Sequence, residues 1–357
     1  MKRRLLASGL FCLAVLACGS SDESALHGPA KDAGMDGSAG MGAAAGQAGG
    51  ASAGAGGQGG TAASSTGGGA GAPEGGAGGT PATCSVAALP AGTTTITVKS
   101  SGQDRSARMV IPKSYDASKP VPLVLVFHGY TESATAIENI SQMTPVAEKA
   151  GVIVVYPQGI LNAWNAGKCC GVASTSNRPD VQFVVDLLDS LEQQLCIDKK
   201  RIYAAGFSNG GMLSNRLACE LSTRFAAIGP VAGPLAIDAC APQRPMPMIE
   251  FHGTGDFVVP YDGGGLSGAK SVKENVDFWQ KNAWCTDGTP GETYKKGDVT
   301  CASYSQCKEG AAVELCTVEG GGHQWPGGKS AGPGGKLTQD VNGSQRMLDF
   351  FLAHPMP

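Results

Sequence analysis

The pentapeptide Gly206-Phe207-Ser208-Asn209-Gly210 places a serine where an apolar run ends and a helix-like run begins. Residues 201–205 have the length and composition of a short buried strand, and residues 211–221 repeat apolar side chains at helical spacing. A serine on such a turn holds strained backbone angles, and the flanking glycines let strand and helix backbones approach each other. The pattern therefore predicts that Ser208 is an exposed nucleophile at the top of a sheet.

The same G-x-S-x-G pattern occurs twice more in this glycine-rich chain, at residues 50–54 and 328–332. The first copy lies inside a low-complexity tract, and Pro333 directly follows the second, which leaves no helix in reach. Only Ser208 has the strand, turn and helix that an activated serine needs.

A serine hydroxyl needs a base, which is normally a histidine, and the chain contains five histidines. His27 lies in the low-complexity tract and His354 in the C-terminal tail, so we expect neither to be held in position. His128 and His252 each end a strand in the sequence Phe-His-Gly, where we expect a structural role such as a hydrogen bond that shapes the loop. His323, in a glycine-rich loop after the last strand, is therefore the predicted base.

The carboxylate that orients the base should also follow a strand, and Asp256 comes shortly after the apolar run at residues 248–251. Asp262 is the alternative, further along a polar loop. Taken alone, Asp256 could be a turn or capping residue. With Asp256 the order is Ser208, Asp256, His323, the nucleophile–acid–histidine order of α/β-hydrolases.

A developing oxyanion requires preorganised backbone donors, one of which is the amide of the residue after the nucleophile, here Asn209. The second should come from the loop after the first long core strand, where we predict the Tyr130 amide.

Two tryptophans lie near these residues in the sequence. Trp164 follows a core strand and Trp325 is two residues after the predicted base. Both are candidates to flank the acyl group by stacking on a phenolic ring or covering an aliphatic ester, although core packing is an almost equal interpretation of Trp164.

Strand-like runs alternate with helical segments, a pattern typical of an α/β fold with a mostly parallel sheet covered by helices on both faces. We predict an opening hairpin at residues 93–98 and 105–111, core strands at 121–127, 152–156, 202–207, 225–231 and 248–251, and a late strand at 312–318. Helices are expected at 137–150, 180–195, 272–282 and 342–352, with Asp180 capping the second. Ligands of such folds bind beyond the carboxyl ends of the strands.

The chain divides into three parts. Residues 1–18 combine Lys2, Arg3 and Arg4 with a short apolar stretch, which predicts an export signal, and its end at Cys18 resembles the lipobox of bacterial lipoproteins. Residues 19–82 are mostly Gly, Ala and Ser, so they cannot bury enough apolar surface to fold and are expected to form a disordered tether. Residues 83–357 are expected to form one catalytic domain outside the cytoplasm, at the cell envelope or beyond it, with possible membrane anchoring through lipid on Cys18.

Ten of the twelve cysteines lie in this domain, and an even number in an exported protein favours disulfides over a metal site. The pairing cannot be deduced from spacing. For the adjacent Cys169 and Cys170 we expect different partners, with a bridge between them as the alternative. The formal net charge is -3 and no basic cluster follows the signal, so a nucleic-acid partner is not expected.

In combination, several segments resemble the esterase and poly(3-hydroxybutyrate) depolymerase family, which includes secreted feruloyl esterases. The matching segments are Phe127-His128-Gly129, Cys169-Cys170-Gly171, residues 206–212, His252-Gly253-Thr254-Gly255-Asp256 and residues 321–327. The resemblance runs from about residue 84 to the C-terminus and implies an α/β-hydrolase with the triad Ser208, Asp256 and His323. Residues 250–253 and 259–264 are most similar to type C feruloyl esterases. Tyr130-Thr131 departs from the family pattern, since many bacterial members have a cysteine there.

The resulting hypothesis is a serine esterase that needs no cofactor or metal and cleaves a polymer-linked ester, releasing hydroxycinnamic acids from plant cell-wall polysaccharide. A poly(3-hydroxybutyrate) depolymerase is the alternative within the same chemistry. A serine peptidase of this fold usually carries a large extra domain, and a non-catalytic surface protein is disfavoured because all three triad positions are filled. The cysteine-rich residues 285–316 are expected to form a stapled loop that shapes the cleft, or else a surface decoration.

Overall fold

A computed structural model of the protein describes residues 84, 86 and 89–357. The predicted export signal with Cys18 and the predicted tether at residues 19–82 lie outside the described residues. Within the described part of the chain, no helix combines the length and the apolar character needed to cross a membrane.

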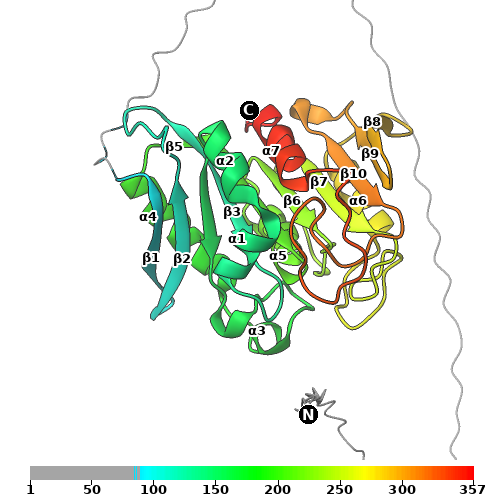
Figure 1. Ribbon diagram of the computed structural model, residues 1–357, viewed down its shortest axis with the longest axis horizontal. Coiled ribbons are helices and arrows are strands. Elements are labelled where there is room, and N and C mark those ends of the chain that lie inside the picture. The colour runs from blue at the N-terminus through cyan, green and yellow to red at the C-terminus, as the bar shows by residue number, and fades with distance from the viewer. Residues whose placement is uncertain (1–83, 85, 87–88) are drawn as a thin grey trace, which may run out of the picture. The chain divides into compact units, whose positions relative to one another are not determined.

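One ten-stranded sheet runs through the described region in the order β1-β2-β4-β3-β5-β6-β7-β10-β9-β8 (Figure 1). Strands β4, β3, β5, β6, β7 and β10 are parallel, and antiparallel hairpins extend the sheet at both edges. The strands are β1 (Gly92–Ser100), β2 (Gln103–Ile111), β3 (Val121–Phe127), β4 (Ile153–Pro157), β5 (Ile197–Phe207), β6 (Ala227–Val231), β7 (Met248–Gly253), β8 (Gly291–Lys296), β9 (Val299–Tyr304) and β10 (Val313–Val318). This arrangement confirms the predicted α/β fold with a mostly parallel sheet.

Local sequence explains the first hairpin. Strands β1 and β2 pair with Val98 opposite Arg105, and Ser101 and Gly102 in the turn have φ values of 47° and 79°. Positive φ at both central residues gives the turn twist that suits a two-residue hairpin. The predicted hairpin is therefore confirmed, as are the core strands, although β5 begins at Ile197 instead of residue 202.

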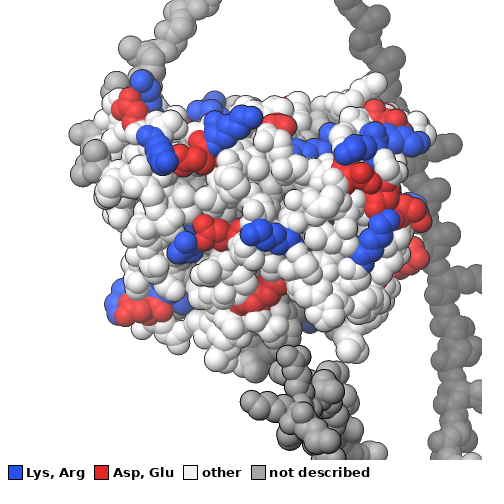
Figure 2. Space-filling view, in the orientation of Figure 1, with Lys and Arg blue, Asp and Glu red and all other residues white. Residues whose placement is uncertain are grey.

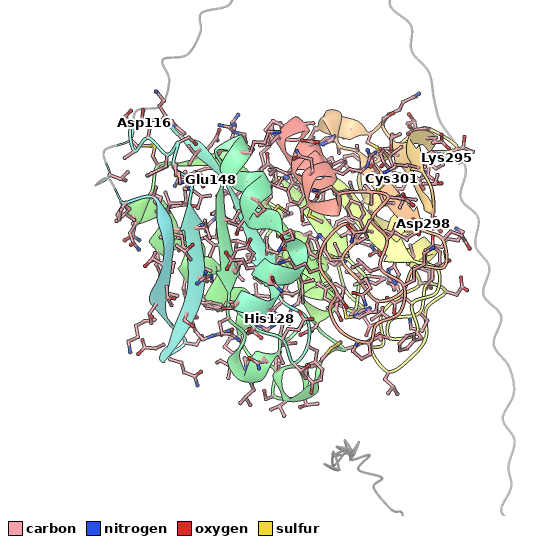
Figure 3. All side chains as sticks on the ribbon, viewed as in Figure 1. Asp116, His128, Glu148, Lys295, Asp298 and Cys301 are labelled. Carbon is pink, nitrogen blue, oxygen red and sulfur yellow. A yellow bond between two sulfur atoms is a disulfide. The ribbon has the colours of Figure 1, made fainter. Side chains whose placement is uncertain are left out.

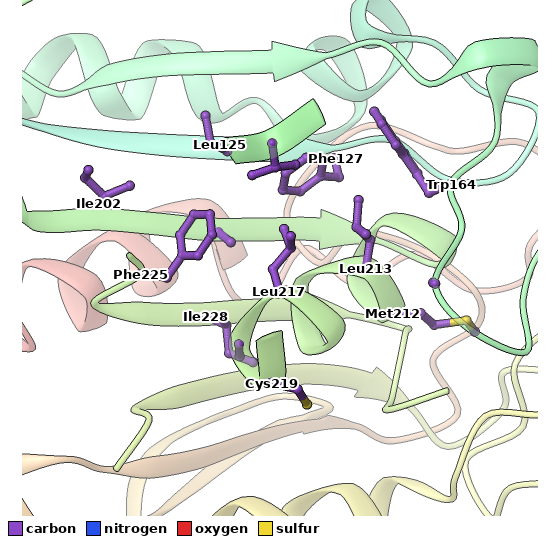
Figure 4. Close-up of a cluster of buried hydrophobic side chains, with 14 of the residues drawn as sticks. Leu125, Phe127, Trp164, Ile202, Met212, Leu213, Leu217, Cys219, Phe225 and Ile228 are labelled. Carbon is purple, nitrogen blue, oxygen red and sulfur yellow. The ribbon is translucent and has the colours of Figure 1, made fainter. Parts of the chain in front are cut away.

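Helices cover both faces of the sheet, and each group buries its own apolar cluster. Helices α1 (Ala134–Ser141), α2 (Met143–Ala150) and α7 (Gly343–Ala353) lie in front in Figure 1, and α4 (Asp180–Gln194), α5 (Asn209–Glu220) and α6 (Val272–Asn282) lie behind. A short helix, α3 (Gly171–Thr175), sits at one end of the sheet. In Figure 4, Leu213 and Leu217 of α5 point toward the sheet, near Phe127 of β3.

Two helix predictions need correction. The helix predicted at 137–150 is two helices, because Gln142 has φ 54° and interrupts the hydrogen-bond ladder between α1 and α2. Asp180 is not a cap: it is the first residue of α4, and its carboxylate accepts hydrogen bonds from Arg105 and the Asn165 amide, each at 2.8 Å. The helix predicted at 272–282 is confirmed, with a capping box between Ser271 and Glu274.

All ten cysteines of the described region form disulfides. The pairs are Cys84–Cys196, Cys169–Cys170, Cys219–Cys240, Cys285–Cys307 and Cys301–Cys316. The expectation of different partners for Cys169 and Cys170 is therefore wrong, and the alternative of a bridge between adjacent residues holds.

The hairpin of β8 and β9 was not predicted, and it lies within the cysteine-rich stretch. It pairs with β10 at the sheet edge, and Figure 3 shows Lys295, Asp298 and Cys301 on this side of the molecule, far from His128. No described residue of 285–316 lines the cavity beside Ser208. The expectation that this stretch shapes the cleft is wrong, because it extends the sheet at its edge instead.

Charged side chains are interspersed by sign on the face drawn in Figure 2, where lysines and arginines lie beside aspartates and glutamates. Several oppositely charged neighbours among the described residues form exposed ion pairs, such as Lys99 with Asp104 at 2.9 Å. This face therefore presents no extended basic surface for a polyanion.

Candidate active site

Ser208 occupies a sharp turn between the end of β5 and the start of α5. Its φ of 55° and ψ of -120° are strained for a residue with a side chain. The turn is held by the Ser208 amide, which donates to the Val231 carbonyl at 2.8 Å, and by the Met212 amide, which donates to the Ser208 carbonyl at 2.9 Å. The structure thus contains the strand–turn–helix elbow that the sequence predicts.

The flanking glycines are required by close backbone contacts. A Cβ added at Gly206 would lie 2.3 Å from the carbonyl carbon of Gly210, and one added at Gly210 would lie 2.2 Å from the carbonyl oxygen of Phe127. Real Cβ atoms do not approach backbone this closely, so only glycine fits at either position without moving β3, β5 or α5.

Asp256 and His323 come together from two loops that are 67 residues apart in sequence. Nδ1 of His323 lies 2.7 Å from Oδ2 of Asp256, while Oδ1 of Asp256 accepts hydrogen bonds from the Val258 and Val259 amides, each at 2.8 Å. Burial opposes ionisation of Asp256, but hydrogen bonds from His252 and His323 outweigh it and hold its pKa below the usual range. Asp262, the alternative, is exposed.

His323 lies against the nucleophile elbow. Its ring centroid is 4.7 Å from that of Phe207, the residue before Ser208, and its amide donates to the Gly334 carbonyl at 2.5 Å. Since Nδ1 faces Asp256, the other ring nitrogen is left for a reacting group. Within the described residues the Ser208 hydroxyl makes no hydrogen bond, whereas His323 is bonded to Asp256. Hydrogen bonds between a nucleophile and its base are often long until substrate binds.

The two predicted oxyanion donors have no acceptor within the described part of the chain. On either side of Tyr130, the Gly129 amide donates to Glu132 Oε2 at 3.0 Å and the Thr131 amide donates to the Asn162 carbonyl at 2.8 Å. The Tyr130 amide lies between these two occupied donors, and the Asn209 amide begins α5. Neither amide is therefore committed to another acceptor among the described residues.

His128 has the structural role that the sequence suggests. It accepts a hydrogen bond at Nε2 from the Gly159 amide at 2.9 Å, so its proton is on Nδ1, which donates to the Gly129 carbonyl at 2.8 Å. Burial lowers its pKa to about 4, which keeps the ring neutral. The ring therefore fixes the loop that carries Tyr130.

His252 has the predicted structural role through the Val259 carbonyl, and it makes two further contacts that sequence analysis missed. Its Nε2 lies 2.8 Å from the Val259 carbonyl and 3.5 Å from Asp256 Oδ2, and its Nδ1 lies 3.4 Å from Glu250 Oε1. Burial opposes protonation, but the hydrogen bonds to Asp256 and Glu250 raise the pKa of His252 to about 9. Glu250 and His252 are two residues apart in β7, so they share a face of the strand, which is the signal that could have found this pair.

The tryptophan predictions are wrong for this structure. Neither Trp164 nor Trp325 has any exposed surface. The Trp164 indole donates to the His128 carbonyl at 3.0 Å and packs on Phe127 (Figure 4), and the Trp325 indole donates to Ser344 Oγ at 3.0 Å. Both rings belong to the buried core, so neither can stack directly on an acyl group.

A cavity of about 570 Å³ opens beside Ser208. It is lined by Tyr130, Met212, the Cys169–Cys170 disulfide, Phe257, Val258 and Leu266, among other residues. Apart from Tyr130 and the cysteines, these side chains carry no motif that sequence analysis could have recognised, since Met212 comes from α5 and the others from the loop between β7 and α6.

Two groups of cysteines and carboxylates are close enough together to resemble metal sites. They are Cys285, Asp287 and Cys307, and Cys301, Glu314 and Cys316. In each group both cysteines form a disulfide with each other, so neither offers the thiolate that binds a metal. The chemistry of these donors does not fit a metal site.

Comparison with known proteins identifies the family of this chain. A family model described as Esterase PHB depolymerase matches residues 107–260. NocK of Nocardia uniformis subsp. tsuyamanensis, provisionally named an esterase, is 32% identical over 267 residues, which cover 67% of this chain and 75% of that protein. The chain belongs to the esterase and PHB depolymerase family.

Two further proteins are similar to this chain. Feruloyl esterase B of Piromyces equi is 37% identical over 246 residues, which are 63% of this chain but only 44% of that protein. Among solved structures, acetyl xylan esterase from Aspergillus awamori aligns with a TM-score of 0.53 at 14% identity, over 73% of this chain and 99% of that one. The likeness confirms the α/β-hydrolase fold.

Proposed function

We propose that this protein is a serine carboxylic-ester hydrolase in which Ser208 is the nucleophile, His323 the base and Asp256 the carboxylate that orients the base. The observation that carries this proposal is the 2.7 Å contact between Asp256 and His323, beside a strained serine elbow. The order of the three residues along the chain is that of α/β-hydrolases.

The reaction has two steps. His323 removes the Ser208 proton as the serine oxygen attacks the ester carbonyl, and the ionised Asp256 stabilises the imidazolium that forms. His323 then protonates the departing alcohol, which leaves an acyl-enzyme. In the second step His323 deprotonates a water molecule that attacks the acyl carbonyl, and the proton returns to the serine as the acid is released.

The negative oxygen of each tetrahedral intermediate would accept hydrogen bonds from the Asn209 and Tyr130 amides. The support for this role is that neither amide has an acceptor within the described residues, whereas Gly129 and Thr131 do. Fixed donors of this kind stabilise charge that develops only in the transition state.

The substrate class follows from the relatives and from the cavity. Feruloyl esterase B, at 37% identity, supports the release of hydroxycinnamic acids from plant cell-wall polysaccharide. The apolar side chains that line the cavity suit a phenylpropenoyl group, and its opening to solvent suits an ester linked to a polymer.

A depolymerase acting on poly(3-hydroxybutyrate) is the second candidate. It is favoured by the description of the matching family and by exposed apolar side chains at the cavity, where Phe257 is 67% exposed and Leu266 is fully exposed. Such side chains could also lie on an aliphatic polyester.

An ester panel tests these proposals. Purified protein should hydrolyse methyl ferulate and short p-nitrophenyl esters, with weaker activity on hydroxybutyrate oligomers, and Ser208→Ala should abolish labelling by a fluorophosphonate probe. Release of hydroxybutyrate without release of ferulate would reverse the order of the two candidates. Cleavage of p-nitroanilides in preference to esters would indicate a peptidase, and an unlabelled, inactive wild type would refute the hydrolase proposal.

We also propose that the protein acts outside the cytoplasm, held at a bacterial envelope through lipid on Cys18. The support within the described residues is five disulfides, which form and persist in oxidising compartments. Metabolic labelling with a palmitate analogue, compared between wild type and Cys18→Ser, tests the lipid attachment.

A further inference from the structure

The Cys169–Cys170 disulfide lies in the wall of the cavity beside Ser208. It joins adjacent residues, so it closes no long loop and cannot stabilise the fold by restricting a large segment of unfolded chain. The four other disulfides join residues 15 to 112 positions apart. The position of the Cys169–Cys170 disulfide at the cavity therefore needs an explanation other than the cross-linking of distant segments.

The disulfide contacts the nucleophile elbow through the side chain of Asn209. This buried amide group donates to the Trp164 carbonyl at 3.1 Å and to Cys169 Sγ at 3.9 Å, and it accepts from the Trp164 amide at 2.8 Å. The Cys170 amide in turn donates to the Trp164 carbonyl at 3.2 Å. The two sulfur atoms therefore have a fixed position relative to the residue that follows Ser208.

Tyr130 closes the cavity next to the disulfide. Gly171 has φ 55°, and a Cβ added there would lie 2.7 Å from the Tyr130 hydroxyl and 3.1 Å from Cε2 of its ring. A side chain at residue 171 would push this ring away. The Cys-Cys-Gly sequence thus brings an aromatic ring and a disulfide together on one side of the cavity.

Three further residues that line the cavity are apolar and exposed. Phe257 and Val258 are 67% and 46% exposed, and Leu266 is fully exposed, although large apolar side chains usually avoid water. Lys168 is the charged side chain among the residues that line the cavity, and it is paired with Asp238 at 2.5 Å. The cavity offers an apolar group many contacts and a charged group few.

We propose that the Cys169–Cys170 disulfide, together with Tyr130 and Met212, forms the binding wall for an aromatic acyl group, and that the exposed apolar side chains cover the second face of the bound group. Sulfur is polarizable and makes favourable contacts with aromatic rings, and a rigid wall loses little conformational entropy on binding. This inference rests on the ester hydrolase function proposed above, and it names the part of the site that selects the acyl group.

Two substrates with the same leaving group isolate the acyl contribution. We would measure kcat/KM for p-nitrophenyl ferulate and p-nitrophenyl acetate with the wild type and with the double variant Cys169→Ser and Cys170→Ser. The ferulate-to-acetate ratio should fall at least tenfold in the double variant, mainly through a higher KM for ferulate, because acetate is too small to contact the wall. An equal loss on both esters, or an unchanged ratio, would overturn the proposal.

The matched control is the double variant Cys219→Ser and Cys240→Ser, which also removes one disulfide but none of the residues that line the cavity. It should keep the wild-type ratio, and a similar fall there would mean that the ratio reports general loosening. A wild type that cleaves neither ester refutes the hydrolase function itself. A wild type that cleaves acetate but not ferulate refutes the aromatic acyl class.

A second measurement does not depend on folding of the cysteine variants. A crystal structure of Ser208→Ala with bound methyl ferulate should place the ferulate ring in van der Waals contact with the sulfur atoms of Cys169 and Cys170. A ring bound elsewhere in the cavity, away from both sulfurs, would overturn the assignment.

Discussion

Nε2 of His252 lies 3.5 Å from Oδ2 of Asp256, the oxygen that also contacts the proposed catalytic base. Behind it, Glu250 Oε1 lies 3.4 Å from His252 Nδ1, and Asn275 donates to the other Glu250 oxygen at 2.8 Å. All four of these side chains are buried. Because these contacts raise the pKa of His252 to about 9, its ring is cationic at pH 7 and lies between two buried carboxyl groups, one of which contacts the proposed base.

The first prediction concerns the dependence of stability on pH. Asp256 and Glu250 raise the pKa of His252 from 6.5 to about 9 in the folded protein. The contribution of His252 to stability is therefore complete below pH 6.5 and is lost as pH rises through about 9. The free energy of unfolding, measured by urea denaturation between pH 6 and pH 10, should decline across this interval. His252→Gln should be less stable at pH 6 and should show a flatter profile.

A profile that falls equally steeply in His252→Gln and in the wild type would assign the alkaline loss to other groups. His128 provides a control, since burial lowers its pKa to about 4 and its titration therefore changes stability only below about pH 6.5. His128→Gln should therefore leave the slope between pH 6.5 and pH 9 unchanged, even if it lowers overall stability.

The second prediction concerns Asp256. Asp256→Asn keeps the shape of the side chain but removes the charge that stabilises the imidazolium, so kcat should fall by about 10⁴. Stopped assays on p-nitrophenyl acetate measure the loss, and circular dichroism checks the fold. Asp262→Asn, a change at an exposed site outside the contacts of His323, should lose less than about threefold; the reverse order of effects would make Asp262 the orienting carboxylate.

The third prediction concerns the elbow glycines. Gly210→Ala would drive a Cβ to within 2.2 Å of the Phe127 carbonyl oxygen, so β3 or α5 must move. We expect a loss of about 2 kcal/mol or more in the free energy of unfolding, together with loss of activity. Gly288→Ala, where nothing lies within 4 Å, should change stability by less than about 0.5 kcal/mol. Equal effects at the two sites would contradict the close approach.

The features that sequence reasoning found are local. The elbow, the β1–β2 hairpin and helix α6 each depend on short runs of consecutive residues, and the structure adds the positive-φ turn at Ser101 and Gly102 and the capping box at Ser271. Elimination among the five histidines then left His323 as the predicted base. Each step used residue type and neighbours in the chain, which the sequence supplies directly.

The features that it missed are set by contacts between distant segments. Trp164 is buried because it packs on Phe127 and His128, which are more than 30 residues away in the sequence. The β8–β9 hairpin has mostly exposed side chains on β8, so it shows little apolar periodicity. None of these arrangements leaves a signal in local composition or spacing.

The last prediction concerns the ion pair that replaced the expected helix cap. Arg105 and Asp180 are in contact at 2.8 Å with side chains only 3% and 0% exposed, and the guanidinium lies 3.9 Å from the centre of the Phe183 ring. Asp180→Asn removes one charge and leaves the other buried, which should cost about 3–5 kcal/mol in the free energy of unfolding. The exposed pair of Lys273 and Asp277 provides the comparison, and Asp277→Asn should cost at most about 1 kcal/mol. Urea denaturation of the two variants at pH 7 measures both values. A cost at Asp180 no larger than that at Asp277 would contradict the prediction. It would mean that water reaches Arg105, because only solvation could compensate for the lost carboxylate.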